Sequence, residues 1–118
     1  MPGKKKYSDK IRLIHAKDAV NKIQDYLGKN KKGSFKKNEM LQDACIRQLQ
    51  VLGEACNTVT KALQKSHPEI EWAQISGLRN IVVHEYFGVD AEIIWNIIKS
   101  DLPPFLKNVI LIIESLPD

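Results

Sequence analysis

Hydrophobic residues recur at helical spacing along most of the chain. Between positions 8 and 27 they follow one another at steps of three and four, which is the spacing of a single buried helical stripe. The pattern predicts a first helix over residues 8–27. The apolar positions of this stripe are Leu13, Ala16, Val20, Ile23 and Leu27.

The next stretch, residues 28–37, contains two glycines and five lysines and has no periodicity, so we expect a basic loop there. A longer apolar seam then starts after Asn38, which can cap a second helix. This helix should have about seven turns and end before Pro68, because the residue preceding a proline is disfavoured in helical geometry. The seam consists of Leu41, Cys45, Leu49, Leu52, Cys56, Val59 and Leu63.

A third helix is predicted from the residues that follow Pro68. Glu69 and Glu71 would lie in its first turn, where negative charge is favoured by the helix dipole. We expect this helix to run to about His84 or Tyr86 and to be broken by Gly88.

Two further helices are predicted in the last third of the chain. Asp90 can cap a helix over residues 91–100. The Pro103 and Pro104 pair marks another helix start, since proline is tolerated in a first turn, and this last helix should reach about Leu116.

These elements predict an all-α fold, an antiparallel four- to five-helix bundle, because no segment alternates convincingly with a period of two. The chain has 118 residues, which fits a single domain over 1–118 with residues 1–7 as a basic N-terminal tail. The last helix is apolar on more than one side. Two interpretations stay open: a second copy covers it in a homodimer, or it is a central helix buried within the monomer.

Composition narrows the class of protein. The formal charge is +4, and a cluster of lysines in the tail and the predicted loop accounts for the excess, so this surface either binds a polyanion or is simply solvated. The longest apolar run, 109–113, is far shorter than the ~18 residues of a membrane span, and the start of the chain lacks the apolar segment of a secretory signal. We therefore expect a cytoplasmic protein without membrane contact.

The sequence offers no metal or cofactor motif. Cys45 and Cys56 lie eleven positions apart, which corresponds to ~16 Å along a helix, too far for a disulfide between them. They are interpreted as buried reduced thiols. Nucleotide-binding glycine loops and zinc-ligand spacings are absent, so we expect no metal and no cofactor.

Candidate chemistry gathers in the stretch GLRNIVVHEYFGVD. On a helical wheel of ~100° per residue, Arg79, Asn80, His84 and Tyr86 share one side. Arginine can hold a phosphate with two parallel hydrogen bonds, and histidine exchanges a proton near neutral pH. This combination suits cleavage of RNA, and a symmetric dimer would supply two histidines to one phosphodiester. The alternative is a set of ordinary structural polar contacts.

The residues 52–105 closely resemble the HepT family of the HEPN superfamily. Its RX4HXY pattern is filled by Arg79, His84 and Tyr86 and is followed by FGVD, and the segment NEMLQDACIRQL is also similar. The resemblance implies a HEPN-like helical bundle, a dimeric composite site and metal-independent ribonuclease activity on RNA, with tRNA as one candidate substrate. It also implies the toxin of a type II/VII toxin–antitoxin module.

In such a module the antitoxin, MntA, is a minimal nucleotidyltransferase that adds AMP to the tyrosine of the pattern. The resemblance therefore implies that Arg79 binds phosphate, that His84 is a general acid or base, that Asn80 supports the site and that Tyr86 is the AMPylation site. Glu54, in the segment LGEA, would either form a salt bridge with Arg79 or pair with Arg47 on the surface.

Two other functions remain open at this point. The chain could be a non-catalytic HEPN interaction module that binds the nucleotidyltransferase and is modified by it. It could also be a nucleotide-sensing domain whose polar face binds a free nucleotide.

Overall fold

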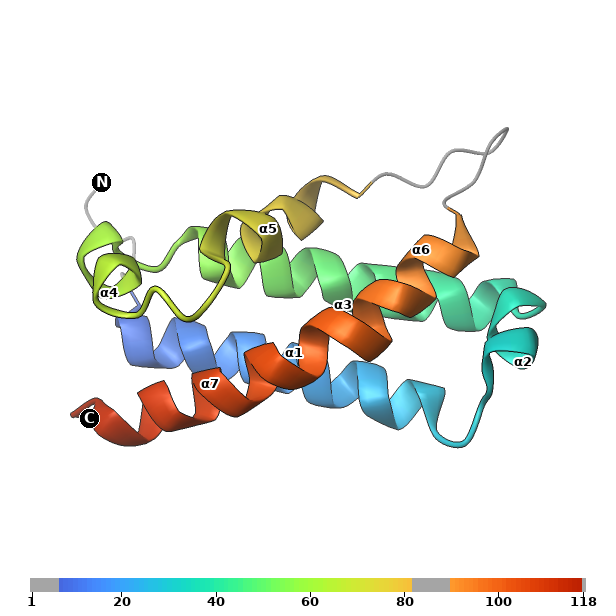
Figure 1. Ribbon diagram of the computed structural model, residues 1–118, viewed down its shortest axis with the longest axis horizontal. Coiled ribbons are helices and arrows are strands. Elements are labelled where there is room, and N and C mark those ends of the chain that lie inside the picture. The colour runs from blue at the N-terminus through green and yellow to red at the C-terminus, as the bar shows by residue number, and fades with distance from the viewer. Residues whose placement is uncertain (1–6, 82–89, 118) are drawn as a thin grey trace.

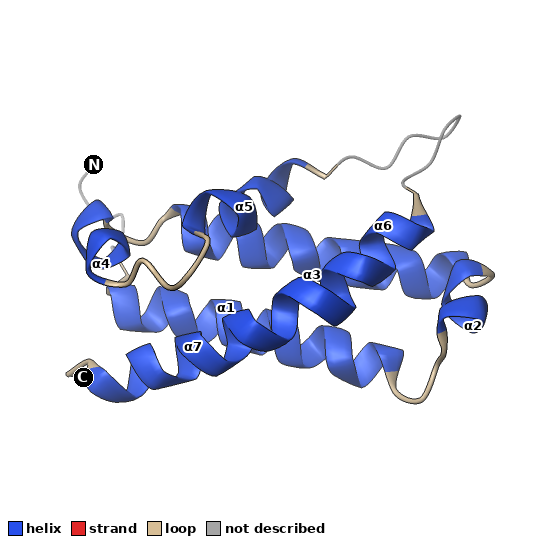
Figure 2. Cartoon of the chain, viewed as in Figure 1, coloured by secondary structure: helices blue, strands red, loops and turns tan. Residues whose placement is uncertain are grey.

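The computed structural model describes residues 7–81 and 90–117, and this part of the chain is helical without strands (Figures 1 and 2). The first prediction is confirmed by α1 (Asp9–Leu27). Its N-cap is Ser8, whose side chain accepts a hydrogen bond from the Ile11 amide. The helix ends at Gly28, where a φ of 51° is in the left-handed region that glycine adopts without strain.

The predicted basic loop is wrong in one respect, because it contains a short helix, α2 (Lys32–Lys36). Phe35 is fully buried and packs against Trp95, with ring centroids 5.5 Å apart. Lys32 and Lys36 both pair with Glu92, whose carboxyl pKa is lowered, first of all by the hydrogen bond from Lys32. One buried aromatic side chain therefore gives this lysine-rich segment a fixed position, which lysine content alone does not indicate.

The long second helix is correct at its start and wrong at its end. Asn38 caps α3 (Glu39–Asn57) as predicted, with its side chain accepting from the Leu41 amide at 3.0 Å. The helix stops at Asn57 instead of continuing to Pro68, and a separate short helix, α4 (Lys61–Ser66), follows.

The interruption has a local cause in the polar bonds of Thr60. Its hydroxyl caps α4 by accepting from the Leu63 amide, while its backbone amide and hydroxyl both donate to the Asp9 carboxylate, at 2.9 and 2.6 Å. These bonds tie the chain to the beginning of α1 and compete with the helical ladder.

The third predicted helix is shorter than expected at both ends. The structure has α5 (Trp72–Gly77) followed by a 3₁₀ turn, η1 (Leu78–Asn80), so Glu69 and Glu71 precede the helix and are not in its first turn. Ile81 is already extended, with φ −62° and ψ 124°. The predicted helix is therefore interrupted at Ile81, and its predicted course to His84 or Tyr86 and the predicted break at Gly88 lie outside the described residues.

The last two predicted helices form one continuous rod in Figure 1. It consists of α6 (Ala91–Asn96), a π-helical turn η2 (Ile97–Asp101) and α7 (Leu102–Ser115). The predicted Asp90 cap is confirmed by a 2.8 Å bond from the Glu92 amide. Pro103 and Pro104 have no amide hydrogen, so the regular ladder cannot pass through them, and the wider π-turn accommodates the missing donors.

The core lies mainly between α1 and α3, which run side by side, and the rod packs against it. Cys45 and Cys56 are fully buried and unpaired, as predicted. Burial raises the pKa of Cys45 to about 11 and that of Cys56 to about 12. Both thiols therefore stay protonated near neutral pH, so neither is an activated thiolate nucleophile.

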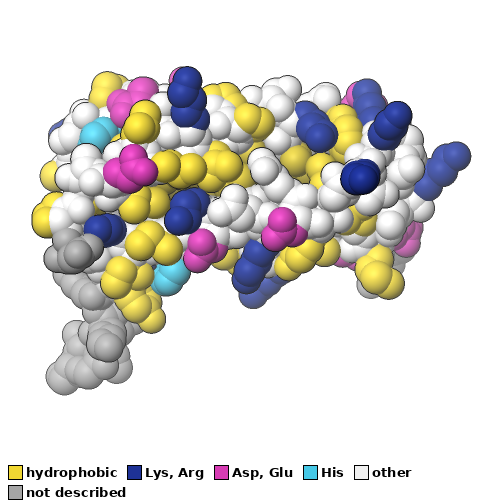
Figure 3. Space-filling view, turned by 90° about the horizontal axis from the view of Figure 1, so that it is seen from below, with side chains coloured by type: hydrophobic (Ala, Val, Ile, Leu, Met, Phe, Trp, Pro, Cys, Tyr) yellow, Lys and Arg dark blue, Asp and Glu magenta, His cyan; other side chains and the backbone are white. Residues whose placement is uncertain are grey.

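The last helix is buried along one side only. Phe105 and Val109 face the core, whereas Ile110 and Leu111 are exposed, Leu111 to 58%. The face formed by α1 and α7 carries a band of hydrophobic side chains (Figure 3). The interpretation of this helix as a central one is therefore wrong, and cover by a second copy stays a prediction. None of the described helices combines the length and apolar character that crossing a membrane requires.

Candidate functional site

An open groove of about 670 Å³ lies between α1, α3 and the η1 turn. It collects side chains from three parts of the chain that are far apart in sequence. The lining residues are Tyr7, Arg12, His15, Arg47, Gln50, Val51, Glu54, Ala55, Thr58 and Arg79.

A glycine on α3 lets the η1 turn reach this groove. A Cβ atom at Gly53 would lie 2.4 Å from the Arg79 amide nitrogen and 3.0 Å from the Leu78 carbonyl carbon. Real side chains do not approach backbone that closely, so only glycine permits the contact. The sequence LGEA thus positions the backbone of Arg79 against α3.

A second residue of α3 fixes the chain just after the turn. The Gln50 side-chain amide donates to the carbonyl oxygen of Ile81. Gln50 and Gly53 are three positions apart and therefore share one face of α3. Together they hold the segment that leads directly into residues 82–89.

Arg79 itself is half-buried and partly committed to its own turn. One of its terminal nitrogens donates to the Ser76 carbonyl at 2.8 Å. The other guanidinium donors make no hydrogen bond within the described residues. A guanidinium held at one edge can still present parallel N–H groups to a phosphate or carboxylate.

The other predicted site residues have different outcomes. Glu54 lines the groove, but it forms no ion pair with Arg79 or with Arg47 within the described residues, so neither predicted pairing is present. Asn80 is exposed at the end of η1 and is not among the groove residues. His84 and Tyr86 lie outside the described residues.

Three cationic or titratable groove residues were not predicted as site residues. His15 lies on the exposed face of α1, where it lines the groove together with Arg12. Arg47 is on the same stripe of α3 as Glu54 and Thr58. Their spacing of three, four or seven positions is visible in the sequence, but only the pairing of α1 with α3 shows that the two polar stripes face one groove.

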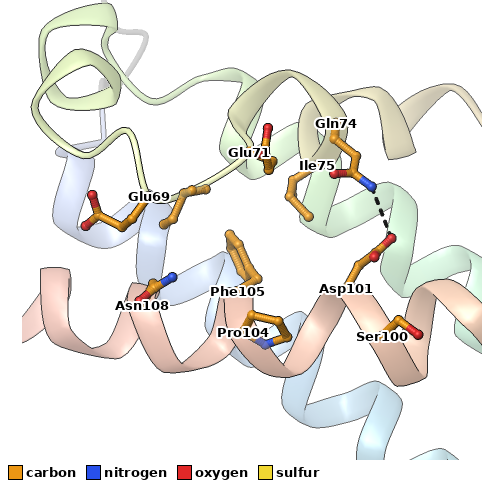
Figure 4. Close-up of a pocket in the computed structure, with 10 residues that line it drawn as sticks. Glu69, Glu71, Gln74, Ile75, Ser100, Asp101, Pro104, Phe105 and Asn108 are labelled. Carbon is orange, nitrogen blue, oxygen red and sulfur yellow. Dashed lines mark hydrogen bonds between the residues drawn. The ribbon is translucent and has the colours of Figure 1, made fainter.

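The charges of the lining residues differ between this groove and a smaller hollow between α5 and the rod. That hollow has about 140 Å³ and presents Glu69, Glu71 and Asp101, with Gln74 donating to Asp101 at 3.2 Å (Figure 4). Its carboxylates would repel an anion. The large groove instead contains all three arginines of the chain and, among its described lining residues, one carboxylate, so it is the candidate site for an anionic ligand.

Comparison with known protein families finds one matching family. The family model described as Ribonuclease HepT-like matches residues 16–112, which include α3, the groove residues of η1 and most of the rod. The chain belongs to the HepT-like ribonuclease family.

Several similar proteins have names that describe them as ribonucleases. The "Probable ribonuclease HepT" of Thermococcus cleftensis is 32% identical, over 83% of this chain and 89% of its own length. The "Putative RNase MJ1380" of Methanocaldococcus jannaschii is 33% identical, over 78% of this chain and 84% of its own length.

A longer relative has two named activities. The "Gamma-glutamylcyclotransferase and putative RNase MJ0434" of the same archaeon is 30% identical over 91% of this chain, which spans only 48% of that protein. No solved structure gives a significant match to the HepT-like chain.

The close approach at Gly53 predicts a position-specific effect of alanine. Gly53→Ala should lower the free energy of unfolding by about 1–3 kcal/mol, because η1 must move away from α3. Gly77→Ala is the matched control, since its Cβ would meet nothing within 4 Å and its φ of −62° suits alanine. That variant should be neutral or up to about 1 kcal/mol more stable. Urea unfolding followed by circular dichroism measures both; equal stability of the two variants would contradict the contact.

Proposed function

We propose that this chain cleaves RNA without a metal ion, with Arg79 and His84 as its catalytic residues, as the toxin of a toxin–antitoxin module. The observation that carries the proposal is that Arg79 lines a groove with the other two arginines. The ribonuclease names of the family support the choice of RNA as the anion. His84 follows Ile81 by three residues, so the chain between them spans at most about 11 Å.

The proposed chemistry divides into proton transfer and charge stabilisation. His84 takes the proton from the ribose 2′-hydroxyl, and the 2′ oxygen attacks phosphorus to form a 2′,3′-cyclic phosphate. The bond to the 5′ oxygen breaks as that oxygen receives a proton from the protonated His84 of a second copy. Arg79 stabilises the charge that develops on the phosphoryl oxygens. Asn80 and Glu54 are proposed as supporting residues, Asn80 beside Arg79 on the turn and Glu54 across the groove.

Cleavage should depend on both proposed catalytic residues. Purified protein should cleave a total tRNA pool in EDTA, while Arg79→Ala and His84→Ala lose about 100-fold or more of the rate, since each removes one catalytic group. Gel analysis of the RNA measures this, with circular dichroism confirming that the variants fold. His67→Ala is the matched histidine control because His67 lies at the end of α4, outside the groove. If the His84→Ala protein cleaved RNA as fast as the wild type, the proposed role of His84 in proton transfer would be wrong.

We propose further that the active form is a homodimer with a composite site. One histidine cannot easily act as base and acid in the same step, and a second copy supplies another. The exposed Ile110 and Leu111 on α7 give the monomer an apolar surface that association would cover.

Subunit mixing tests this arrangement. Wild-type and His84→Ala proteins, unfolded together and refolded as an equal mixture, should keep about a quarter of the activity of the same total amount of wild type, because only about a quarter of the dimers then carry both histidines. Wild type mixed in the same way with His67→Ala should keep its full activity. Light scattering reports whether dimers form; retention of about half of the activity, as sites within single chains would give, or a wild type that stays monomeric, would contradict the composite site.

The proposed partner is an MntA-type nucleotidyltransferase that inhibits the ribonuclease by adding AMP to Tyr86. The physical reason is electrostatic. An adenylate carries negative charge close in sequence to Arg79, so it would compete with the RNA phosphate for the same guanidinium.

Modification should follow a single tyrosine. Incubation with the cognate nucleotidyltransferase and ATP should add AMP to the wild type and to Tyr26→Phe but not to Tyr86→Phe, and the modified protein should lose RNA cleavage. Intact-mass measurement and the tRNA assay report the two effects. Modified protein that cleaves as well as before would refute this regulation, and AMP transfer to a protein without any ribonuclease activity would favour the interaction-module hypothesis.

A further inference from the structure

We infer that the groove binds single-stranded RNA outside the reacting bond, with Arg12 and Arg47 on flanking phosphates and Tyr7 under an unpaired base. This inference rests on the proposed function, because it names the strand and the contacts that the same site would use. It assigns roles to three residues outside the RX4HXY pattern: Arg12 on α1, Arg47 on α3 and Tyr7, which directly precedes the α1 cap.

The first observation is the separation of arginine from lysine. The chain has 18 basic residues, of which only three are arginines, and all three line the groove. None of the described lysines is among the lining residues, and α2 with its lysines lies at the opposite end of the bundle (Figure 1). Arginine binds phosphate through two parallel donors and stacks on bases, whereas lysine acts as a hydrated point charge.

The second observation is that the two additional arginines are not neutralised. Arg47 is exposed on α3 and forms no ion pair within the described residues. Arg12, on α1, lies over the Tyr7 ring at 5.8 Å, a contact that orients the guanidinium without cancelling its charge. Two helices therefore place unpaired cations in the same groove as Arg79. Several cations in one groove can each bind one phosphate along a single strand.

The third observation is an aromatic platform beside those cations. The Tyr7 ring meets His15 edge-on, with centroids 5.5 Å apart and an interplanar angle of 78°, and yet the residue is 49% exposed. A ring held in this way loses little freedom when a base stacks on it. Single-strand binding sites combine a cationic groove with such aromatic surfaces, whereas the bases of a duplex are already stacked and paired. The geometry therefore favours a single strand.

Among the described residues that line the groove, only Glu54 carries a negative charge that opposes a phosphate. It is exposed and makes no ion pair with the neighbouring arginines, so its charge acts directly on a bound anion. Neutralising it should strengthen RNA binding, which is the opposite sign from removal of either arginine. A purely structural role for these side chains would not produce two opposite signs.

Binding can be measured without cleavage by fluorescence anisotropy of a labelled 12-nucleotide single-stranded RNA in EDTA, with every variant made in the His84→Ala protein. Arg12→Ala and Arg47→Ala should each weaken binding about tenfold and reduce the slope of log K against log salt by about 0.7.

Tyr7→Ala should weaken binding about tenfold while Tyr7→Phe, which keeps the ring, binds nearly as well. Glu54→Gln should bind more tightly. The same sequence as a duplex should bind at least tenfold more weakly.

Lys107→Ala is the matched charge control, since Lys107 is exposed on α7 and is not part of the groove. Circular dichroism establishes that each variant is folded, and Arg47→Lys, which keeps the charge but not the paired donors, should bind at an intermediate strength. A loss for Lys107→Ala as large as that for Arg12→Ala, or equal binding of duplex and single strand, overturns the inference.

The two proposals can fail separately. RNA cleavage that is insensitive to Arg12→Ala and Arg47→Ala, in otherwise wild-type protein, would leave the proposed catalysis intact and remove the flanking contacts. Binding through these residues by a protein that cleaves no RNA would keep the inference and remove the catalysis.

Discussion

The candidate site depends on one steric constraint, the contact between the backbone of η1 and the Cα of Gly53. Because a side chain at this position would lie 2.4 Å from the Arg79 amide nitrogen, α3 and η1 can approach only through a glycine. The contact brings a turn that follows α5 onto the polar face of α3. Gln50, one turn earlier, adds a hydrogen bond to the Ile81 carbonyl, so that the turn is held at its end as well. The position of Arg79 in the groove is thus a property of α3 as much as of its own motif.

Local polar bonds then decide where the other helices end. Asp9 and Thr60 interrupt what the apolar seam alone describes as one long helix, and the same bonds join the start of α1 to the start of α4. In the last helical rod, Pro103 and Pro104 lack backbone N–H donors and change the backbone hydrogen-bond pattern. They do not end the rod, because the wider π-turn at residues 97–101 accommodates the missing donors. Hydrophobic periodicity is therefore a good guide to which residues are buried and a weaker guide to where helices stop.

The sequence predicted the elements that local chemistry determines. The caps Asn38 and Asp90, the stripe of α1 and the buried cysteines follow from side-chain type and spacing within one helix. The extended backbone at Ile81 was not predicted, because the aliphatic residues that follow it in the sequence continue a helical pattern.

The same division applies to the site. Arg79 was predicted from its side-chain type, its helical spacing and the family pattern, and Glu54 from the segment LGEA; both line the groove. Arg12, His15 and Arg47 were missed because their importance comes from the packing of α1 beside α3, which no single-helix pattern contains. Asn80 shares the turn of Arg79 but faces solvent, so adjacency in sequence did not place it in the groove.

The position of the two described chain ends has a practical consequence for anyone handling the molecule. The ammonium group of Lys10 donates to the carbonyl of Leu116 at 3.2 Å, so the beginning of α1 and the end of α7 meet at the end of the bundle where Tyr7 and Arg12 lie. A bulky group attached at the start of α1 or at the end of α7 would crowd the mouth of the groove. Immobilisation through the lysines of α2, at the far end of the bundle, would leave that mouth open to incoming molecules.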